Sequence, residues 1–207
     1  MGYSNSFSNE ALAGVMLSHI CHLLSVLILH ELTLTVYYIL CQPKRCQLAL
    51  VAASLHIISP AGMFLSAPCA ESCFSFLNFL GFYCYAKTLE GHSNIAEICK
   101  DMLILFSGIA FGVATTFRGN GLFSGLTLVY DAIACITVIL RNRKIKSGIR
   151  RLCVTCVSGA LMAGIACVPQ YLAYDEYCRR WDTKENARPW CSGWIPSIYG
   201  WVQKEYW

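Results

Sequence analysis

Four charged side chains stand inside or at the edge of apolar segments of this 207-residue chain. Because a charge carries a desolvation cost in lipid or in an apolar core, such residues usually face other protein groups or water. They are therefore the first places to look for chemistry. The four are Glu31, Glu71, Arg118 and Asp131.

Arg118 is the most informative of them, because Gly119 and Gly121 follow it and clear space beside its side chain. A guanidinium offers a planar fork of donors that matches phosphate oxygens. A cation is also favourable where a helix ends, because the helix dipole leaves negative partial charge there. Phosphate recognition and helix-end stabilisation both stay open at Arg118, and a site role and a helix-start role both stay open at Glu71.

The last part of the chain holds all five tryptophans, together with Cys178 and Cys191. An indole ring is flat and apolar with one N–H donor, so it suits stacking on a sugar or anchoring at a membrane surface. The two cysteines flank a short polar loop, and we expect a disulfide worth about 3 kcal/mol between them in an oxidising lumen. The tryptophans are Trp181, Trp190, Trp194, Trp201 and Trp207.

Two pairs of potential metal ligands carry less weight. His19 and His22 are three residues apart, as are Cys153 and Cys156, but neither pair has a second pair of ligands near it in sequence. A structural metal site needs about four ligands. We therefore expect no metal site.

The elements that position these residues are membrane-spanning helices. Hydrophobic residues make up 56% of the chain and charged residues 14%, which is too apolar for an ordinary soluble domain. A helix needs about 20 apolar residues to span hydrocarbon. We predict an all-α membrane protein with about six spans in residues 1–173 and a luminal, Trp-rich segment in residues 174–207. The spans lie near 11–39, 46–65, 69–86, 102–117, 122–140 and 152–173, and Pro60 interrupts the second.

Basic residues occur at every second gap between these spans. Lys44 with Arg45, then Lys87 with Lys100, precede a cluster of six that follows residue 140. Cytosolic loops carry such an excess of Lys and Arg, so the cluster marks the cytosolic side and not a nucleic-acid site. The gap at 59–68, the turn at 118–121 and the tail then share the luminal side. The cluster comprises Arg141, Arg143, Lys144, Lys146, Arg150 and Arg151.

Two spans carry small residues four positions apart. Gly108 with Gly112, and Gly159 with Ala163, are expected to let neighbouring helices approach closely.

A set of short motifs follows a fixed order from about Ser59 to Trp207 and resembles the GPI mannosyltransferase 2 family, where GPI is glycosylphosphatidylinositol. That family belongs to glycosyltransferase family 76, and the resemblance implies a GT-C-like helical bundle. The first motifs are Ser59-Pro60-Ala61, Phe64-Leu65-Ser66, Ala70-Glu71 and Arg118-Gly119-Asn120-Gly121-Leu122. The later ones are Pro169-Gln170-Tyr171, Cys178, Pro189-Trp190-Cys191, Ile195-Pro196 with Ile198-Tyr199, and Tyr206-Trp207.

The chain departs from the family pattern in two ways. It reads Cys69-Ala70-Glu71 where the family has Tyr-Ser-Glu, so only the carboxylate is kept. The family's upstream His-Trp-Asp motif, whose aspartate is the presumed base, has no counterpart here, so we expect the catalytic aspartate to be absent. The family also continues through further spans beyond Trp207. We therefore expect an incomplete form of the enzyme.

The resemblance implies transfer of the second mannose from dolichol-phosphate-mannose to the GPI precursor, by a multi-pass protein of the endoplasmic reticulum membrane that uses no cofactor. It assigns substrate binding to Arg118 as the phosphate contact, with Asn120 beside it. Glu71 would orient a sugar hydroxyl or pair with Arg118, and Trp190 would stack on mannose or anchor the tail. Whether a small accessory membrane subunit takes part stays open. So does a non-catalytic scaffold or partner-binding role, which the missing base favours.

Overall fold

The chain is helical throughout the part that the structure describes, and no strand occurs there. The structure is a computed structural model, and it describes residues 3–59, 70–90, 96–141, 145–179, 189–192 and 197–206. The prediction of an all-α protein is confirmed for these ranges. The long helices are α1 (Tyr3–Val36), α2 (Gln42–Ile57), α4 (Ala70–Leu89), α5 (Glu97–Phe117), α6 (Leu126–Leu140) and α7 (Ile145–Tyr174).

Shorter elements also occur in the described part of the chain. The 3-10 helix η1 (Gly119–Gly125) joins α5 to α6. The π-helical turn η2 (Asp175–Arg179), the 3-10 turn η4 (Pro189–Ser192) and the helix α8 (Ile198–Tyr206) follow α7 and form the tail.

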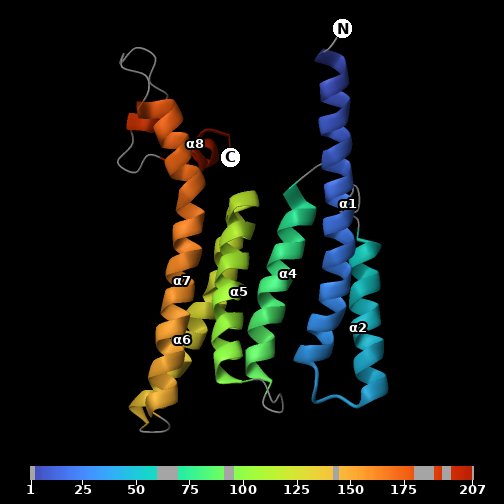
Figure 1. The fold of residues 1–207 in the computed structure, drawn as a ribbon, viewed down its shortest axis with the longest axis vertical. Coiled ribbons are helices and arrows are strands. Elements are labelled where there is room, and N and C mark those ends of the chain that lie inside the picture. Colours follow the sequence, from blue (N-terminus) through green and yellow to red (C-terminus); the bar gives the residue numbers. More distant parts are fainter. Residues whose placement is uncertain are drawn as a thin grey trace.

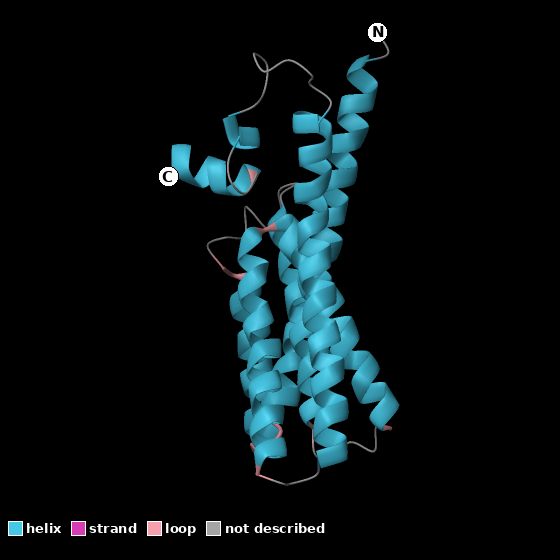
Figure 2. Cartoon of the chain, turned by 90° about the vertical axis from the view of Figure 1, so that its left-hand side faces the viewer, coloured by secondary structure: helices cyan, strands magenta, loops and turns pink. Residues whose placement is uncertain are grey.

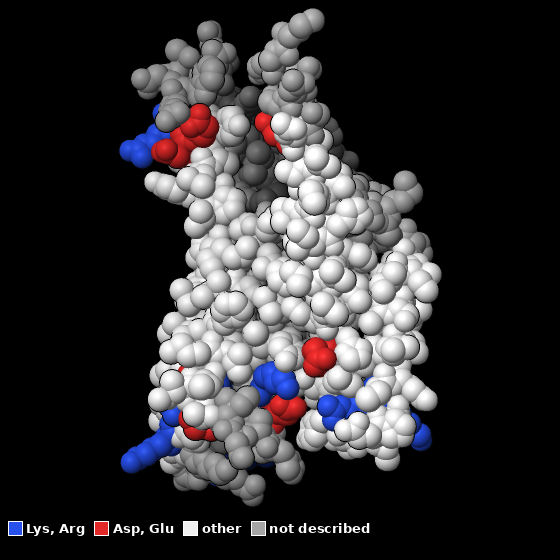
Figure 3. Space-filling model, turned by 45° about the vertical axis from the view of Figure 1, so that its right-hand side comes forward, with Lys and Arg blue, Asp and Glu red and all other residues white. Residues whose placement is uncertain are grey.

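The bundle helices alternate in direction, so successive connections lie at opposite ends (Figure 1). Helices α1, α4 and α6 end at the lower end of that view, whereas η1 and the described parts of the tail lie at the upper end. The C-terminus and the N-terminus lie toward this same end (Figure 2). Most Lys and Arg side chains visible in Figure 3 lie at the lower end. The fold therefore has the alternation of ends that the basic gaps predict.

Four stretches of the described chain are long and apolar enough to cross a membrane, where six were predicted. They are Asn9–Val36, Glu97–Phe117, Gly119–Leu140 and Ile145–Arg179.

The second and third predicted spans are the ones that fall short. The span predicted at 46–65 corresponds in its described part to α2, a 16-residue helix that ends at Ile57, and residues 60–65 lie outside the described residues. Such a helix is about 24 Å long, less than the roughly 30 Å of a hydrocarbon core. The span at 69–86 corresponds to α4, which has 20 residues but carries Glu71, Asn78 and Lys87. These polar residues make α4 less apolar than the four candidate spans.

The helices pack around a small apolar centre. α5 packs between α4 and α7, α6 packs on α7, and α1 contacts both α2 and α4. Phe111 of α5 is fully buried and meets Phe82 of α4 edge to face, with ring centroids 5.0 Å apart. Ile104, Leu128 and Met162 complete this core. The centre of the bundle therefore lies at α5, with α4 on one side and α7 on the other.

The two pairs of small residues behave differently. A Cβ atom at Gly108 would clash with Oγ of Ser158, and one at Gly112 would lie 3.0 Å from Cβ of Ile165. Both glycines therefore allow α5 and α7 to approach, as predicted. A Cβ at Gly159 would meet no atom within 4 Å, so among the described residues Gly159 makes no close helix contact, in contrast to the prediction.

Side-chain hydroxyls join the helices where apolar side chains are small. Ser18 of α1 and Ser72 of α4 share a hydrogen bond of 2.6 Å. Ser158 of α7 donates to the backbone oxygen of Ile104, at 2.7 Å, and so ties α7 to α5. Interhelical hydrogen bonds of this kind are common between membrane helices. They fix the positions of α4 and α5, the two helices that carry the site below.

Candidate functional site

Glu71 and Arg118 meet at the upper end of the bundle. Glu71 lies in the first turn of α4, and Arg118 directly follows α5 as its C-cap. Nη1 of Arg118 donates to Oε1 of Glu71 at 3.0 Å. Each charge also complements its own helix end, because a carboxylate is favourable at an N-terminus and a cation at a C-terminus. Glu71 and Arg118 therefore each stabilise a helix end and also pair with each other.

The backbone after Arg118 turns tightly into η1. Arg118 is extended, with φ −144° and ψ 127°, and its carbonyl oxygen accepts a hydrogen bond from the N–H of Gly121 at 2.9 Å. A Cβ atom at Gly121 would lie 2.8 Å from both N and Oγ1 of Thr115. Only glycine therefore fits there. Gly119, in contrast, faces open space, with no atom within 4 Å of a Cβ built on it.

The guanidinium of Arg118 remains partly open to a ligand. The Arg118 side chain is 44% exposed and that of Glu71 is 31% exposed. The ring of Phe74, one turn along α4 from Glu71, lies 5.9 Å from the guanidinium carbon. Arginine carries five N–H donors, and the ion pair with Glu71 uses Nη1. Among the described residues, the donors on the other nitrogens are left for an anion that approaches the upper end.

The other predicted binding residues lie at the same end but outside this pair. Asn120 is exposed within η1, two residues after Arg118. Trp190 lies in η4 of the tail and is 6% exposed, so its indole is buried rather than presented to a ligand. Trp181, Trp194 and Trp207 lie outside the described residues. The site, as described, thus joins Glu71 and Arg118, with Asn120 nearby.

The tail is fastened on itself and on α7. Cys178 and Cys191, the pair named from the sequence, form a disulfide with a Cα–Cα distance of 5.6 Å. Oγ of Ser197, just before α8, lies 3.5 Å from Oε1 of Gln170 of α7. These links hold the described parts of the tail at the upper end of the bundle, the end that carries Arg118 (Figure 1).

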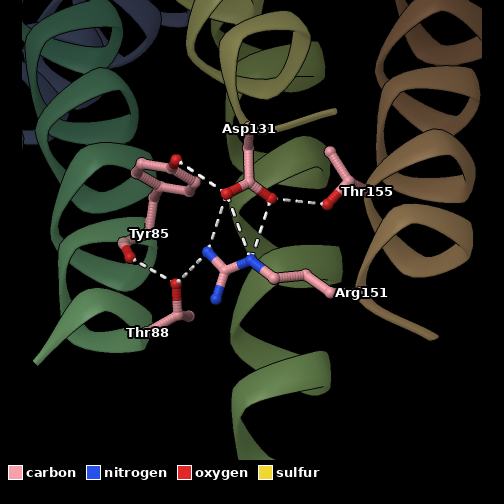
Figure 4. A network of polar contacts seen from close by, with 5 residues as sticks. All are labelled: Tyr85, Thr88, Asp131, Arg151 and Thr155. Carbon is pink, nitrogen blue, oxygen red and sulfur yellow. Dashed lines mark hydrogen bonds and ion pairs between the residues drawn. The ribbon is translucent and has the colours of Figure 1, made fainter. Parts of the chain in front are cut away.

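A second arginine and carboxylate pair lies deeper in the bundle. Asp131 of α6 accepts hydrogen bonds from Arg151 of α7, at 2.8 Å from Nη2 to Oδ1 and 3.1 Å from Nε to each carboxylate oxygen. Thr155 donates to Oδ2 at 2.8 Å, and Tyr85 of α4 donates to Oδ1 at 3.1 Å (Figure 4). Nη2 of Arg151 also donates to Thr88, at 3.3 Å. This network joins α4, α6 and α7.

The pairing of Asp131 with Arg151 was not predicted from the sequence. Asp131 stood out as a charge inside a span, but Arg151 was assigned to the cytosolic cluster. Asp131 lies nine residues before α6 ends, and Arg151 lies six residues after α7 begins. Counted from the shared connection, the two Cα atoms are about 13 and 9 Å deep. A long arginine side chain spans that difference. Comparing the depths of the two residues on the antiparallel helices could therefore have predicted the pair.

Several other charges at the lower end form ion pairs with one another. A cavity of about 320 Å³ there is lined by Asp131 and Arg151 and by several charged residues of α5 and α7. Within it, Nε of Arg150 lies 2.9 Å from Oδ2 of Asp101, and Nζ of Lys100 lies 3.2 Å from Oε1 of Glu97. Each Lys or Arg side chain that lines this cavity has an acidic partner, which favours a structural role for these charges.

Glu31, the last of the four charges singled out from the sequence, makes a local contact. Its Oε1 lies 3.3 Å from Nδ1 of the adjacent His30, and its side chain is 56% exposed. It belongs to neither polar site.

Comparisons with known proteins point to one family. The model of the family described as "Mannosyltransferase (PIG-V)" matches residues 9–207. A protein of Gibberella zeae named GPI mannosyltransferase 2 is 38% identical over 96% of this chain and 44% of its own length. The proteins of that name from Chaetomium globosum and Aspergillus oryzae are 39% and 38% identical, over 96% and 100% of this chain and 44% and 46% of theirs. No solved structure matches.

Proposed function

The chain belongs to the PIG-V mannosyltransferase family, and on that premise we propose that it carries the donor-phosphate site of an enzyme that adds the second mannose to GPI precursors. The donor is dolichol-phosphate-mannose and the acceptor is a mannose already on the GPI lipid. The chain spans less than half the length of the curated relatives that it matches. The proposal therefore assigns to this chain one part of the site, the part that holds the phosphate.

The observation that carries the proposal is the Glu71 and Arg118 pair. It fixes a partly exposed guanidinium at the end of the bundle where the tail also lies. In the reaction, an acceptor hydroxyl attacks C1 of mannose while the bond from C1 to the phosphate oxygen breaks, and the phosphate leaves with the electron pair. A phosphate leaving group needs no proton, so no general acid is required, in contrast to hydrolysis of a glycoside. A single base takes the proton of the hydroxyl.

The residues of this chain bind and orient in that reaction. The free N–H groups of Arg118 contact the departing phosphate, because a guanidinium matches phosphate oxygens. Glu71 holds the guanidinium in place through its bond to Nη1. Asn120 offers a hydrogen-bonding side chain beside it. The transfer needs no cofactor on this proposal, and the base comes from residues beyond the pair described here.

We further propose that the upper end faces the lumen of the endoplasmic reticulum, with residues 174–207 as a luminal segment. The disulfide of Cys178 with Cys191 supports this, because disulfides persist in oxidising compartments. The basic residues at the lower end support a cytosolic location for that end. The partners are then the donor lipid and the GPI intermediate, and a small accessory membrane subunit is a further candidate partner.

Replacing Arg118 with alanine in the complete enzyme tests the proposal. We expect transfer of mannose from dolichol-phosphate-mannose to fall about 100-fold, the usual effect of removing one group that stabilises developing charge. Arg179→Ala is the matched control, since Arg179 is a tail arginine at the same end whose side chain is 74% exposed and pairs locally with Asp175. Unchanged transfer in Arg118→Ala would remove the phosphate assignment.

A non-catalytic role as a scaffold or partner-binding protein is the second candidate. It is favoured by one structural observation, the pairing of Arg118 with Glu71, which gives each charge a partner without a ligand. Mannosyl transfer measured with this chain and with a version extended upstream separates the two. Transfer by the extended form supports the enzyme, and binding of the donor without transfer by both forms supports the scaffold.

A further inference from the structure

A second polar contact joins α4 to the segment that follows α5. Oγ of Ser124, in η1, donates to Oδ1 of Asn78 of α4 at 2.5 Å. Ser124 is 8% exposed, and Asn78 is half-buried. Asn78 lies eight residues after α4 begins, which is about 12 Å along the helix. A buried amide or hydroxyl needs a hydrogen-bond partner, and each of these two side chains provides one for the other.

Asn78 and Glu71 lie on the same face of α4. They are seven residues apart, which is two helical turns, and Phe74 lies between them on that face. Glu71 accepts a bond from Nη1 of Arg118, and the Phe74 ring lies 5.9 Å from the guanidinium carbon. Asn78 binds Ser124, six residues after Arg118. One face of α4 thus contacts both Arg118 and the far part of η1.

Glycines bring η1 close to the two other helices beside it. A Cβ atom at Gly121 would lie 2.8 Å from N of Thr115 of α5, and one at Gly125 would lie 2.8 Å from Sδ of Met162 of α7. These close approaches set the distance of η1 from α5 and α7. The position of η1 relative to α4 depends on the two polar contacts above.

The two polar contacts with α4 differ in strength. The pair of Arg118 with Glu71 is partly exposed, and ion pairs that are open to water contribute little. The bond of Ser124 to Asn78 is more deeply buried, and leaving either group without a partner there would be costly. The buried bond can therefore keep η1 on α4 while the guanidinium turns from Glu71 to a ligand.

We propose that Asn78 and Ser124 are positioning residues of the donor-phosphate site. Their bond holds η1 against α4, and so keeps the guanidinium of Arg118 beside the phosphate during transfer. Neither side chain touches the substrate. This inference rests on the proposed function and names two residues that act through Arg118. Misplacing a group in an active site by about 1 Å can lower a rate about 100-fold.

The kinetics of Ser124→Ala in the complete enzyme test the proposal. The assay uses dolichol-phosphate-mannose and a GPI intermediate as substrates. We expect kcat/KM for the donor to fall about tenfold, the factor that one hydrogen bond is worth. The KM for the acceptor should stay unchanged, because the bond positions only the phosphate contact. Asn78→Ala removes the same bond from the side of α4 and should give the same two results.

The double variant of Ser124→Ala with Arg118→Ala separates positioning from general support of the fold. If Ser124 acts through Arg118, its replacement has no further effect once the guanidinium is gone. The double variant should then transfer mannose as fast as Arg118→Ala alone. A bond that only supports the fold would lower transfer by the same factor with and without Arg118.

Ser158→Ala is the matched control. The hydroxyl of Ser158 also makes a buried bond between helices, to the backbone oxygen of Ile104 at 2.7 Å, but it joins α7 to α5 and does not contact η1. Its loss should lower kcat/KM for the donor by less than about twofold.

Two outcomes would overturn the positioning role and leave the proposed function standing. One is an unchanged kcat/KM in both Ser124→Ala and Asn78→Ala while Arg118→Ala is impaired. The other is an equal loss from Ser124→Ala in the presence and in the absence of Arg118. Unchanged transfer in Arg118→Ala would remove the proposed function itself, and the positioning role with it.

Discussion

The bundle contains two arginine and carboxylate pairs that differ in what surrounds them. The Asp131 carboxylate is 6% exposed and accepts bonds from Arg151, Thr155 and Tyr85. The Glu71 side chain is 31% exposed, and its partner Arg118 is 44% exposed and keeps donors that the pair does not use. A saturated, buried pair fastens helices together, whereas an open pair can give one of its partners to a ligand. The two pairs have the same chemistry, and the difference in exposure favours a structural role for Asp131 with Arg151 and fits the binding role that we propose for Arg118.

Breaking the buried pair should have the largest effect on stability. Asp131→Ala leaves the charge of Arg151 in the bundle without its partner, so we expect a loss of about 3–5 kcal/mol in the free energy of unfolding. Thermal unfolding in detergent measures it. Asp101→Ala is the control at the same end, since Asp101 pairs with the more exposed Arg150 and should cost under about 1 kcal/mol. Equal, small losses in both variants would show that Asp131 does not fasten the helices.

Removing the disulfide at the upper end should have the next largest effect on stability, and this effect should be confined to the tail. Cys178→Ser removes the disulfide to Cys191, which is worth about 3 kcal/mol for a loop of this size. We expect faster proteolysis after residue 174, with unfolding of the bundle unchanged. Cys167→Ser, at a free and exposed cysteine, should leave proteolysis as it was. A tail that is equally resistant without the disulfide would contradict this account.

Breaking the open pair should have the smallest effect on stability. Glu71→Gln removes the ion pair to Arg118 but buries no charge, so we expect a change of under about 1 kcal/mol in the free energy of unfolding. Thermal unfolding beside Asp131→Ala measures the contrast directly. If the free energy of unfolding fell as much as in Asp131→Ala, both pairs would be structural, which would contradict the proposed difference between them.

Most features that are set within a single helix could be predicted from the sequence. Apolar length and the alternation of basic gaps gave the helical bundle, the two ends and the shared location of Arg118 and the tail. The count of six spans was too high because α2 ends at Ile57 and α4 carries polar residues such as Asn78. The sequence did contain a signal for the short α2, because Pro60 follows Ile57 by three residues and a proline interrupts a helix.

Features that depend on how two helices are rotated and aligned were less accessible. Gly108 and Gly159 stand in the same spacing pattern, yet Gly108 packs on Ser158 and Gly159 makes no close helix contact among the described residues. The partner of Asp131 was visible only by counting depth on α6 and α7 together. Spacing within one helix shows which residues share a face, and it does not show what that face meets.

The account depends most on the two ends of the bundle lying on opposite sides of the membrane. Cys41 and Cys46 are free and exposed at the lower end, so they report on that side without any substitution, and Asn120→Cys adds a reporter beside Arg118. Sealed vesicles of endoplasmic reticulum, cytosolic face outward, are treated with a membrane-impermeant maleimide before and after permeabilisation, and labelled peptides are identified by mass spectrometry. We predict that Cys41 and Cys46 label in sealed vesicles and that Asn120→Cys labels only after permeabilisation. Labelling of Asn120→Cys together with Cys41 in sealed vesicles would contradict the account.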